Sequence, residues 1–328
     1  MTLLNIFFII IGVALVIWGA DRLTEGAASL ARALRVPEIV IGLTILAAGT
    51  SAPELFVSLV SALKGTSDLA VGNVIGSNIF NAMLIVGCSA AVAPMTISQS
   101  TVRKDIPFAL IASLLLFLLC FDDMDSPHLW GNEISRSDGL ILLVVFAAFI
   151  IYTFSKARKD GQITDDDDDD DEEKPRMDKK VLWKNVLWMV VGLVCLIYGS
   201  NLFVDAASYV AYRFGVRQSV VGLTIVAGGT SLPELATSVV AAYKGRSAIA
   251  IGNVIGSNVF NILLILGLTA VVHPMRIMGI TIVDLTMMLV SMGLLWMFAF
   301  TKYYVSRREG AVLIIGFLAY MGWLLYLL

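Results

Sequence analysis

Two segments of this 328-residue chain repeat each other at a distance of 180 residues. Residues 40–81 and 220–261 align without a gap, and 28 of the 42 aligned positions are identical. Each copy contains Gly-Thr-Ser-x-Pro-Glu, which ends at Glu54 in the first copy and at Glu234 in the second. Both glutamates lie in apolar surroundings, where an ionisable residue is costly and indicates a functional site. The chain is therefore built from two related halves, each carrying one carboxylate within an apolar segment.

Apolar segments of membrane-spanning length recur along the whole chain. Hydrophobic residues make up 58% of the sequence and charged residues 15%, with a mean hydropathy of +0.85, which excludes an ordinary soluble domain. The sequence predicts an all-α polytopic membrane protein in a lipid bilayer, with no nucleic-acid partner and no obligatory protein partner. The ten predicted spans lie at roughly 3–20, 39–64, 69–92, 106–121, 138–154, 183–204, 219–244, 249–272, 279–300 and 310–328.

Five spans precede a polar segment and five follow it. We therefore predict a first five-helix repeat at 1–154, an acidic linker at 155–182 and a second five-helix repeat at 183–328. Because each half has an odd number of spans, the halves enter the membrane from opposite sides and form inverted repeats, as in secondary transporters. Placing the linker in the cytoplasm puts 18 Lys and Arg residues inside and 5 outside. This charge distribution predicts that both termini face outward.

The linker contains nine consecutive carboxylates, Asp165–Glu173, flanked by basic residues. A charge run of this kind is typical of a solvated connection between domains. A weak regulatory cation site is the alternative. The acidic loop 121–138, predicted to be external, is interpreted as an ordinary exposed loop, with cation concentration near the entrance as its alternative.

The repeated motif predicts a broken helix in each half. Glycine destabilises a helix. Pro53 and Pro233 each lack a backbone N–H, and their rings clash with the carbonyl group four residues earlier. A broken helix at membrane depth is tolerated only where its backbone is buried in protein or lines a cavity. We expect unpaired carbonyls around Ala47 and Ala227, at the negative end of each first half-helix. Such carbonyls predict a cation site.

Side-chain oxygens reinforce this prediction in both copies. Spacings of three and four residues place the Thr, Ser and Glu of the motif on one helical face, and a Ser and an Asn four residues apart follow in the next span. No Lys or Arg lies mid-span nearby. A shell made only of oxygens suits hard cations such as Ca²⁺ or Na⁺ and argues against zinc or copper. The alternative for the hydroxyls is a hydrogen bond to their own helix. The G-x-x-x-G spacings at Gly72/Gly76 and Gly252/Gly256 are interpreted as helix-packing contacts.

The motifs resemble the repeats of the Ca²⁺/cation antiporters, the family that includes the sodium/calcium exchangers: G-T-S-x-P-E followed by G-N-x-x-G-S-N-x-F-N. The resemblance implies ten helices, an ion site at the midplane between the repeats, a prokaryotic plasma membrane, and first and sixth helices that slide as a pair. Several members carry aspartate at the position of Asn261, and this departure speaks against potassium dependence. The ligands implied by the resemblance are Thr50, Ser51, Glu54, Ser77, Asn81, Thr230, Ser231, Glu234, Ser257 and Asn261, with the carbonyls of Ala47 and Ala227.

Charge balance favours exchange over leak. Two ionised glutamates give an empty site a charge of about −2, which is unfavourable to carry through a low-dielectric region. One Ca²⁺ neutralises it, and three Na⁺, the ratio implied by the resemblance, leave one positive charge. We predict an electrogenic secondary transporter that exchanges Ca²⁺ for Na⁺ by alternating access, without a cofactor. A proton/calcium antiporter and, from a different class, a Ca²⁺-permeable channel are the alternatives; an enzyme is not expected, since no nucleophile–base pair occurs in the spans.

Overall fold

The structure is a computed structural model that describes residues 2–120, 133–166, 179–216, 221, 225, 227–277 and 279–327. Among these residues, one pair of helices with the length and composition of a span is bent by 46° at a short break, Glu38–Thr50 and Ala52–Leu63. In the same described part of the chain, seven further helices are long and apolar enough to cross a membrane: Leu4–Leu34, Ser67–Val92, Arg136–Ala157, Trp183–Arg213, Ser247–Val272, Ile282–Lys302 and Arg307–Tyr326.

The first half contains α1 (Thr2–Leu34), α2 (Glu38–Ile41), η1 (Gly42–Leu46), α3 (Ala47–Thr50), α4 (Ala52–Leu63), α5 (Ser67–Ile79), η2 (Phe80–Ile85), α6 (Val86–Val92), β1 (Met95–Thr96), η3 (Thr101–Asp105), α7 (Ile106–Leu119), β2 (Glu133–Ile134) and α8 (Arg136–Asp166). The second contains α9 (Lys179–Arg213), α11 (Ala227–Thr230), α12 (Leu232–Tyr243), α13 (Ser247–Val259), η5 (Phe260–Leu266), α14 (Gly267–Val272), β3 (Met275–Arg276), α15 (Ile282–Lys302), β4 (Tyr304–Val305) and α16 (Arg307–Leu327). Elements labelled η are π-helical.

Each of the ten predicted spans has a helical counterpart among the described residues. The span 106–121 corresponds to α7, and the span 219–244 to α11 and α12, although much of its beginning lies outside the described residues. Several helices extend beyond the predicted bounds: α8 continues to Asp166 and α9 begins at Lys179. Helical structure therefore enters both ends of segment 155–182, while most of the acidic run at 165–173 and of the loop 121–138 lies outside the described residues.

The two halves are related by an inverted two-fold arrangement that is visible where α1 and α9 cross. A Cβ added at Gly12 would lie 2.8 Å from the carbonyl oxygen of Gly199, and one at Gly19 would lie 2.5 Å from that of Gly192. The repeat offset of 180 residues makes Gly12 equivalent to Gly192 and Gly19 equivalent to Gly199. The contact of Gly12 with Gly199 is therefore the symmetry equivalent of the contact of Gly19 with Gly192. The helices run antiparallel, and the absence of side chains lets their backbones touch. The inverted repeats predicted from the sequence are therefore confirmed.

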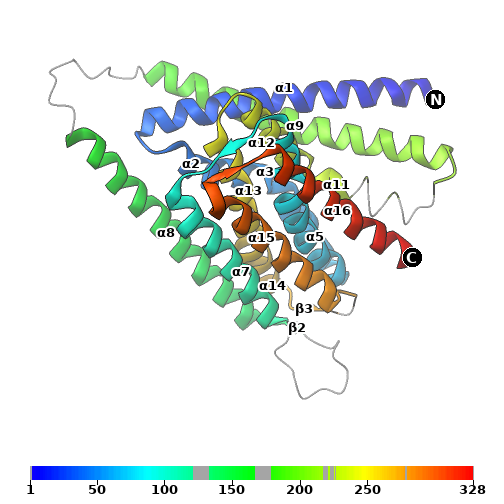
Figure 1. Cartoon of the computed structure of the whole chain (residues 1–328). Coiled ribbons are helices and arrows are strands. Elements are labelled where there is room, and N and C mark those ends of the chain that lie inside the picture. The colour runs from blue at the N-terminus through cyan, green and yellow to red at the C-terminus, as the bar shows by residue number, and fades with distance from the viewer. Residues whose placement is uncertain are drawn as a thin grey trace.

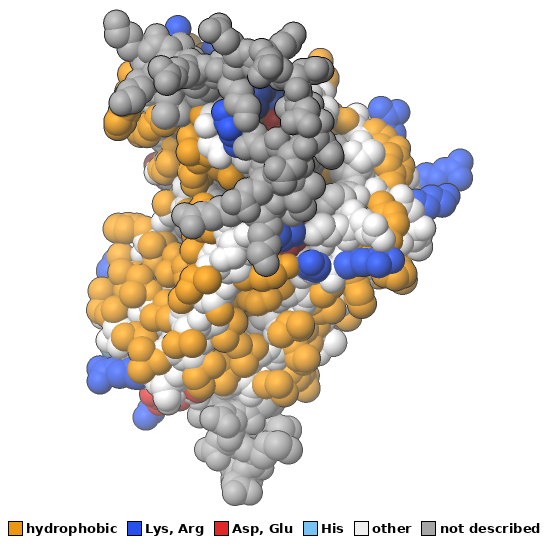
Figure 2. Space-filling model, turned by 90° about the vertical axis from the view of Figure 1, so that its left-hand side faces the viewer, with side chains coloured by type: hydrophobic (Ala, Val, Ile, Leu, Met, Phe, Trp, Pro, Cys, Tyr) orange, Lys and Arg blue, Asp and Glu red, His pale blue; other side chains and the backbone are white. Residues whose placement is uncertain are grey.

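The helices α1 and α9 lie side by side across the remaining bundle (Figure 1). Within the bundle, α5–α6 and α13–α14 are the most buried spans among the described helices, and both carry the G-N-x-x-G-S-N motif. The outer spans expose many large apolar side chains. Figure 2 shows these side chains spread over one side of the molecule, with Lys and Arg at its edges and also near its middle. This is the surface expected of a protein surrounded by lipid.

Two short antiparallel sheets join the halves at the two ends of the bundle. Met95 of β1 pairs with Val305 of β4, and Ile134 of β2 pairs with Met275 of β3. We call the end that holds β1, β4 and the end of α8 the linker face, and the end that holds β2 and β3 the opposite face. At the linker face Lys244, which follows α12, forms ion pairs with Asp21 and Glu25 of α1 and so attaches this helix to the bundle.

Candidate functional site

The bend in the second span occurs at Ser51, two residues before Pro53, which lies in the first turn of α4. The prediction of an unpaired carbonyl at Ala47 is wrong, because the backbone N–H of Ser51 donates to it at 3.0 Å. Ser51 stays close to helical geometry, with φ −81° and ψ 7°, and proline near the start of a new helix removes a donor that the first turn does not use. The Ala47 carbonyl retains a second lone pair that a cation can use. Ala227 begins the matching short helix α11.

The two glutamates of the repeated motif are buried where the halves meet. Glu54 is 0% exposed and Glu234 is 1% exposed. Ser231 Oγ donates to Glu54 Oε1 at 3.0 Å, and Ser51 Oγ donates to Glu234 Oε1 at 3.1 Å. The sequence grouped each serine with the glutamate of its own helix, but the hydroxyl of each bonds to the carboxylate of the other repeat. The two carboxylates are thereby brought to one interface.

The second carboxylate oxygens, Glu54 Oε2 and Glu234 Oε2, are buried and find no hydrogen-bond donor among the described residues. Among those residues, no Lys or Arg forms an ion pair with either glutamate. The part of the chain that the structure describes also contains no cluster of three or more His, Cys, Asp or Glu side chains. A cation bound to these carboxylates would therefore complete its shell with hydroxyl, amide and backbone oxygens. Such a donor set fits Na⁺ or Ca²⁺.

Serines on the two most buried spans lie next to this pair. Ser77 Oγ of α5 is 3.1 Å from Ser231 Oγ, which links it to the Glu54 carboxylate. Ser257 occupies the matching position of α13, and its buried Oγ has no partner among the described residues. Ser77 therefore joins the site by direct contact, and Ser257 by its place in the repeat.

The asparagines that follow these serines lie on π-helical turns. Asn81 is in η2 and Asn261 is in η5, and both side chains are buried. Their amide nitrogens donate to Asn258 Oδ1 at 3.0 Å and to Asn78 Oδ1 at 3.4 Å, respectively. The oxygens Asn81 Oδ1 and Asn261 Oδ1 have no donor among the described residues. Each asparagine thus offers a buried neutral oxygen to a cation.

The hydroxyl groups of the motif threonines have other partners that compete with cation binding. Thr50 Oγ1 lies 3.2 Å from the Leu46 carbonyl oxygen, 3.5 Å from the Ala47 carbonyl oxygen and 3.2 Å from Asn253 Oδ1, so its single proton can serve only one of the three. The alternative of a hydroxyl bonded to its own helix therefore applies to Thr50 in part. Thr230 ends α11 and directly precedes Ser231, which places it beside the carboxylates by chain position.

Sequence reasoning missed a set of asparagines around the site, of which Asn78, Asn253 and Asn258 are buried and Asn73 is half-buried. Asn78 and Asn258 hold the two amides described above, and Asn253 contacts Thr50. Asn73 donates to Ser58 Oγ at 3.1 Å, and Asn253 repeats that contact with Ser238 Oγ at 3.0 Å. The signal was present in the repeated G-N-x-x-G-S-N, since buried amides in an apolar span need partners.

The glycines of α13 have the packing role that the sequence assigned to both copies of the motif, whereas a Cβ at Gly76 of α5 would have no described atom within 4 Å. A Cβ at Gly252 would lie 2.9 Å from the Ile39 carbonyl oxygen, and one at Gly256 would lie 2.7 Å from both the Leu43 oxygen and the Ala47 Cβ. Helix α13 therefore touches the backbone of the segment that leads to the bend at Ser51. This contact fixes the distance between two spans that contribute to the site.

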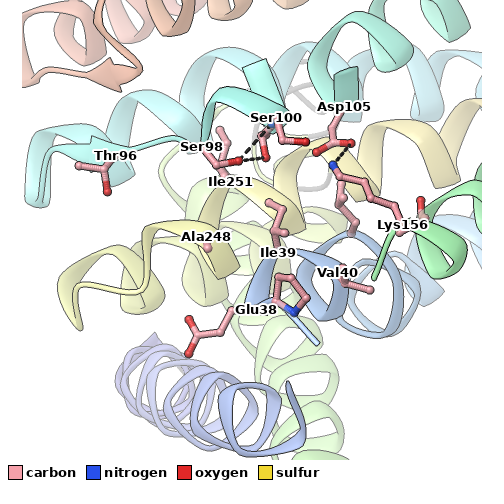
Figure 3. Close-up of a pocket in the computed structure, with 14 residues that line it drawn as sticks. Glu38, Ile39, Val40, Thr96, Ser98, Ser100, Asp105, Lys156, Ala248 and Ile251 are labelled. Carbon is pink, nitrogen blue, oxygen red and sulfur yellow. Dashed lines mark hydrogen bonds and ion pairs between the residues drawn. The ribbon is translucent and has the colours of Figure 1, made fainter. Parts of the chain in front are cut away.

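A cavity of about 330 Å³ opens at the linker face and is separate from the predicted ligands (Figure 3). Ile39, Val40 and Leu43 form part of its apolar wall. Figure 3 shows Asp105 and Lys156 pointing toward one another, with Asp105 Oδ1 3.5 Å from Lys156 Nζ. Because its walls include none of the predicted ligands, the candidate site is the buried oxygen cluster at the interface of the halves and not this cavity.

Comparison with known proteins shows the protein family to which this chain belongs. The model of the family described as sodium/calcium exchanger protein matches residues 4–155 and 184–326. The chain is 37% identical to inner membrane protein YrbG of Escherichia coli (strain K12) over 83% of this chain and 81% of that protein. It is 32% identical to sodium/calcium exchanger MaX1 of Methanosarcina acetivorans over the whole of both chains.

A solved structure has the same fold. The sodium-calcium exchanger NCX_Mj, soaked with Na⁺ in the absence of Ca²⁺, superimposes with a TM-score of 0.82 at 27% identity, over 98% of this chain and 99% of that one. This structural similarity covers both halves. It includes the spans that are only partly described in this structure or whose described helices are too short to cross a membrane. The ten-helix fold in two repeats is therefore shown for the chain as a whole.

Proposed function

Since the chain belongs to the sodium/calcium exchanger protein family and is a membrane cation exchanger rather than an enzyme, we propose that it exchanges Ca²⁺ for Na⁺ by coupled antiport. The observation that carries the proposal is the pair of buried carboxylates, Glu54 and Glu234, each with one oxygen that has no donor among the described residues. Buried charges are paired or bind cations. The names of MaX1 and NCX_Mj state sodium and calcium, which supports this ion pair.

The proposed shell takes oxygens from both repeats. The carboxylates supply charge, the serines and asparagines supply neutral oxygens, and the carbonyls at the ends of the first half-helices supply dipoles. The bond that Ala47 keeps to Ser51 leaves one lone pair for this role. The proposed ligands are Ala47, Thr50, Ser51, Glu54, Ser77, Asn81, Ala227, Thr230, Ser231, Glu234, Ser257 and Asn261.

The charge of this shell explains why transport would be coupled. With both carboxylates ionised, the empty site carries about −2, and moving it past a low-dielectric barrier is unfavourable. One Ca²⁺ cancels that charge, and three Na⁺ exceed it by one, so that exchange is electrogenic. An empty carrier that cannot easily reorient gives exchange and not leak.

A proton/calcium antiporter is the second candidate. The name of YrbG states no ion, and the two carboxylates at one interface could accept protons in the return step. Reconstituted vesicles separate the two candidates. Calcium uptake should follow an imposed sodium gradient and respond to membrane voltage. Uptake that ignores sodium and follows a pH gradient would establish the proton antiporter, and uptake without any counter-ion gradient would establish a channel.

We further propose a prokaryotic plasma-membrane location with both termini outside. Residues 1–154 and 183–328 would act as the two five-helix repeats, joined by a cytoplasmic linker at 155–182. The name of YrbG as an inner membrane protein supports the location, and the 18-to-5 distribution of basic residues supports the orientation. Labelling of single cysteines placed in the linker and near residue 2, in intact cells and in inverted vesicles, tests the orientation.

A further inference from the structure

Four buried asparagines form a network that crosses between the repeats. Asn81 Nδ2 donates to Asn258 Oδ1 at 3.0 Å, and Asn261 Nδ2 donates to Asn78 Oδ1 at 3.4 Å. All four side chains are about 1% exposed. Asn78 and Asn81 are three residues apart on one helix, yet each of them bonds to an amide of the other repeat. The network therefore links the ion-facing asparagine of one half to a second asparagine of the other half.

The direction of these bonds decides which atom faces a cation. An asparagine amide has an accepting oxygen and a donating nitrogen on groups of nearly equal shape. Because Asn258 and Asn78 present oxygens, they hold the nitrogens of Asn81 and Asn261 and leave the Oδ1 atoms of those residues without a donor among the described residues. A reversed amide would present two N–H groups to the ion and repel it.

Resting on the function proposed above, we infer that Asn78 and Asn258 are positioning residues: each fixes the amide of the ion-site asparagine in the other repeat so that its oxygen faces the cation. They touch no ion themselves. They also make positions 81 and 261 prefer an amide over a carboxylate, since a carboxylate has no proton to give to the oxygens of Asn258 and Asn78. The network is thus a determinant of the charge of the site.

The two positioning residues are anchored differently. Asn258 Nδ2 donates to the backbone carbonyl of Asn78 at 3.4 Å, whereas Asn78 Nδ2 approaches the sulfur of Met288 at 3.9 Å. Sulfur is a weak acceptor, so Asn78 loses less when its amide turns round. Asn261→Asp should therefore be tolerated better than Asn81→Asp, because only the former faces a partner that can reverse and donate to the new carboxylate.

A set of double-mutant cycles on the purified full-length protein tests the inference. Ca²⁺ affinity is measured by titration in sodium-free buffer for Asn258→Ala, Asn81→Ala and their combination, and for the corresponding set at Asn78 and Asn261. We expect Asn258→Ala to weaken binding about three- to tenfold in the parent, from the usual net strength of one hydrogen bond. In the Asn81→Ala background it should weaken binding less than about twofold, because nothing remains to be positioned.

The pair Asn78 and Asn81, neighbours on one helix, is the matched control. Their separate effects should multiply, since no hydrogen bond joins them. The inference would be overturned if the separate effects on Ca²⁺ affinity multiplied for the pairs that cross between the repeats. It would also be overturned if coupling occurred only between Asn78 and Asn81. A Ca²⁺ affinity of Asn81→Asp closer to that of the parent than the affinity of Asn261→Asp would overturn the proposed difference in anchoring.

Failure of the proposed function gives a different result. If the parent does not exchange sodium for calcium but binds either cation, the same cycles run with that cation still decide the inference. A parent that binds neither Na⁺ nor Ca²⁺ overturns both proposals. If an alanine variant does not yield monodisperse protein, the serine variants carry the same cycles, because they also remove the amide oxygen while leaving a smaller void.

Discussion

Gly256→Ala is the most direct way to alter the site without replacing a proposed ligand. Gly256 lies on α13 and faces the segment η1–α3, which leads to Ala47 and the bend. The added Cβ would lie 2.7 Å from the Leu43 oxygen, 2.7 Å from the Ala47 Cβ and 2.8 Å from the Leu43 Cα. Two of these three atoms belong to the backbone, so no flexible side chain can move aside.

The structure sets the size of the effect. To reach ordinary contact the two segments must separate by roughly 0.8 Å, since favourable carbon contacts begin near 3.5 Å. Overpacking of this kind costs about 1–3 kcal/mol, and the better helix propensity of alanine offsets up to about 1 kcal/mol. The net loss of stability should therefore lie between about 0 and 2 kcal/mol. Because misplacement by about 1 Å can cost a functional site up to 10²-fold, we expect Ca²⁺ affinity to fall about tenfold.

The assay is a calcium titration of the purified protein, with sodium-driven flux in vesicles and thermal unfolding as a check on folding. Gly293→Ala is the matched control. It introduces the same change in the spanning helix α15, where no described atom lies within 4 Å of the new Cβ. Parent-like Ca²⁺ affinity in Gly256→Ala would show that the approach of α13 to this segment does not set the site geometry.

Three shorter predictions test other parts of the molecule. Glu54→Gln and Glu234→Gln should each abolish or severely cut calcium flux, whereas Asp105→Asn, a buried carboxyl outside the cluster, should retain it; normal flux in either glutamine variant removes that residue from the shell. Replacing Asp165–Asp171 with Gly and Ser should leave flux largely intact, and a collapse would show that the run is more than a linker. Partial burial lowers the pKa of Lys244, but hydrogen bonds and charges from its two acidic partners on α1 outweigh this and raise the pKa above its usual value. Its stabilisation, about 0.5–1 kcal/mol, should hold at neutral pH and be lost only as pH rises beyond about 10.5, so the difference in thermal unfolding between parent and Lys244→Met should close there.

Hydropathy and repetition were sufficient to predict the spans and their inverted arrangement. Each span is recognisable as an apolar run, and counting these runs gives five, an odd number, in each half. Helix ends were less predictable. The first apolar run stops near residue 20, but α1 continues to Leu34, because charged residues such as Asp21 and Arg22 end hydrophobicity without ending a helix. Only Pro37, shortly beyond, is incompatible with continuing it.

The local chemistry of the break was predicted only in part. Proline and glycine correctly indicated a bend at Ser51, but not how many hydrogen bonds it would cost. Loss of one N–H does not oblige the preceding residues to leave helical geometry, so Ala47 kept its donor. The π-helical turns η1, η2 and η5 were also unexpected, because an extra residue in one helical turn leaves no trace in an apolar sequence.

The contacts that define the site were beyond reasoning along a single helix. Spacings of three and four residues group Ser51 with Glu54, but the side chains that share a face point toward the other repeat, where Ser51 meets Glu234. Inverted symmetry then requires the converse bond from Ser231 to Glu54. The sequence therefore predicts which side chains take part in the contacts, but not which of them pair. The pairing depends on how closely the glycines of α13 let the halves approach.

This crossed arrangement has a consequence for transport. Both proposed carboxylates and both proposed amides are held by a residue of the opposite half. A movement of one repeat against the other would therefore lengthen bonds at all four proposed ligands together, whereas a slide of α1 and α9 as a pair would leave these bonds in place, because neither helix contributes to them. A cation bound between the two carboxylates favours the arrangement in which these bonds are short, while an empty site leaves two like charges to repel each other across the same interface. At the proposed ion site, occupancy and the contact between the halves would thus be linked by the same few hydrogen bonds.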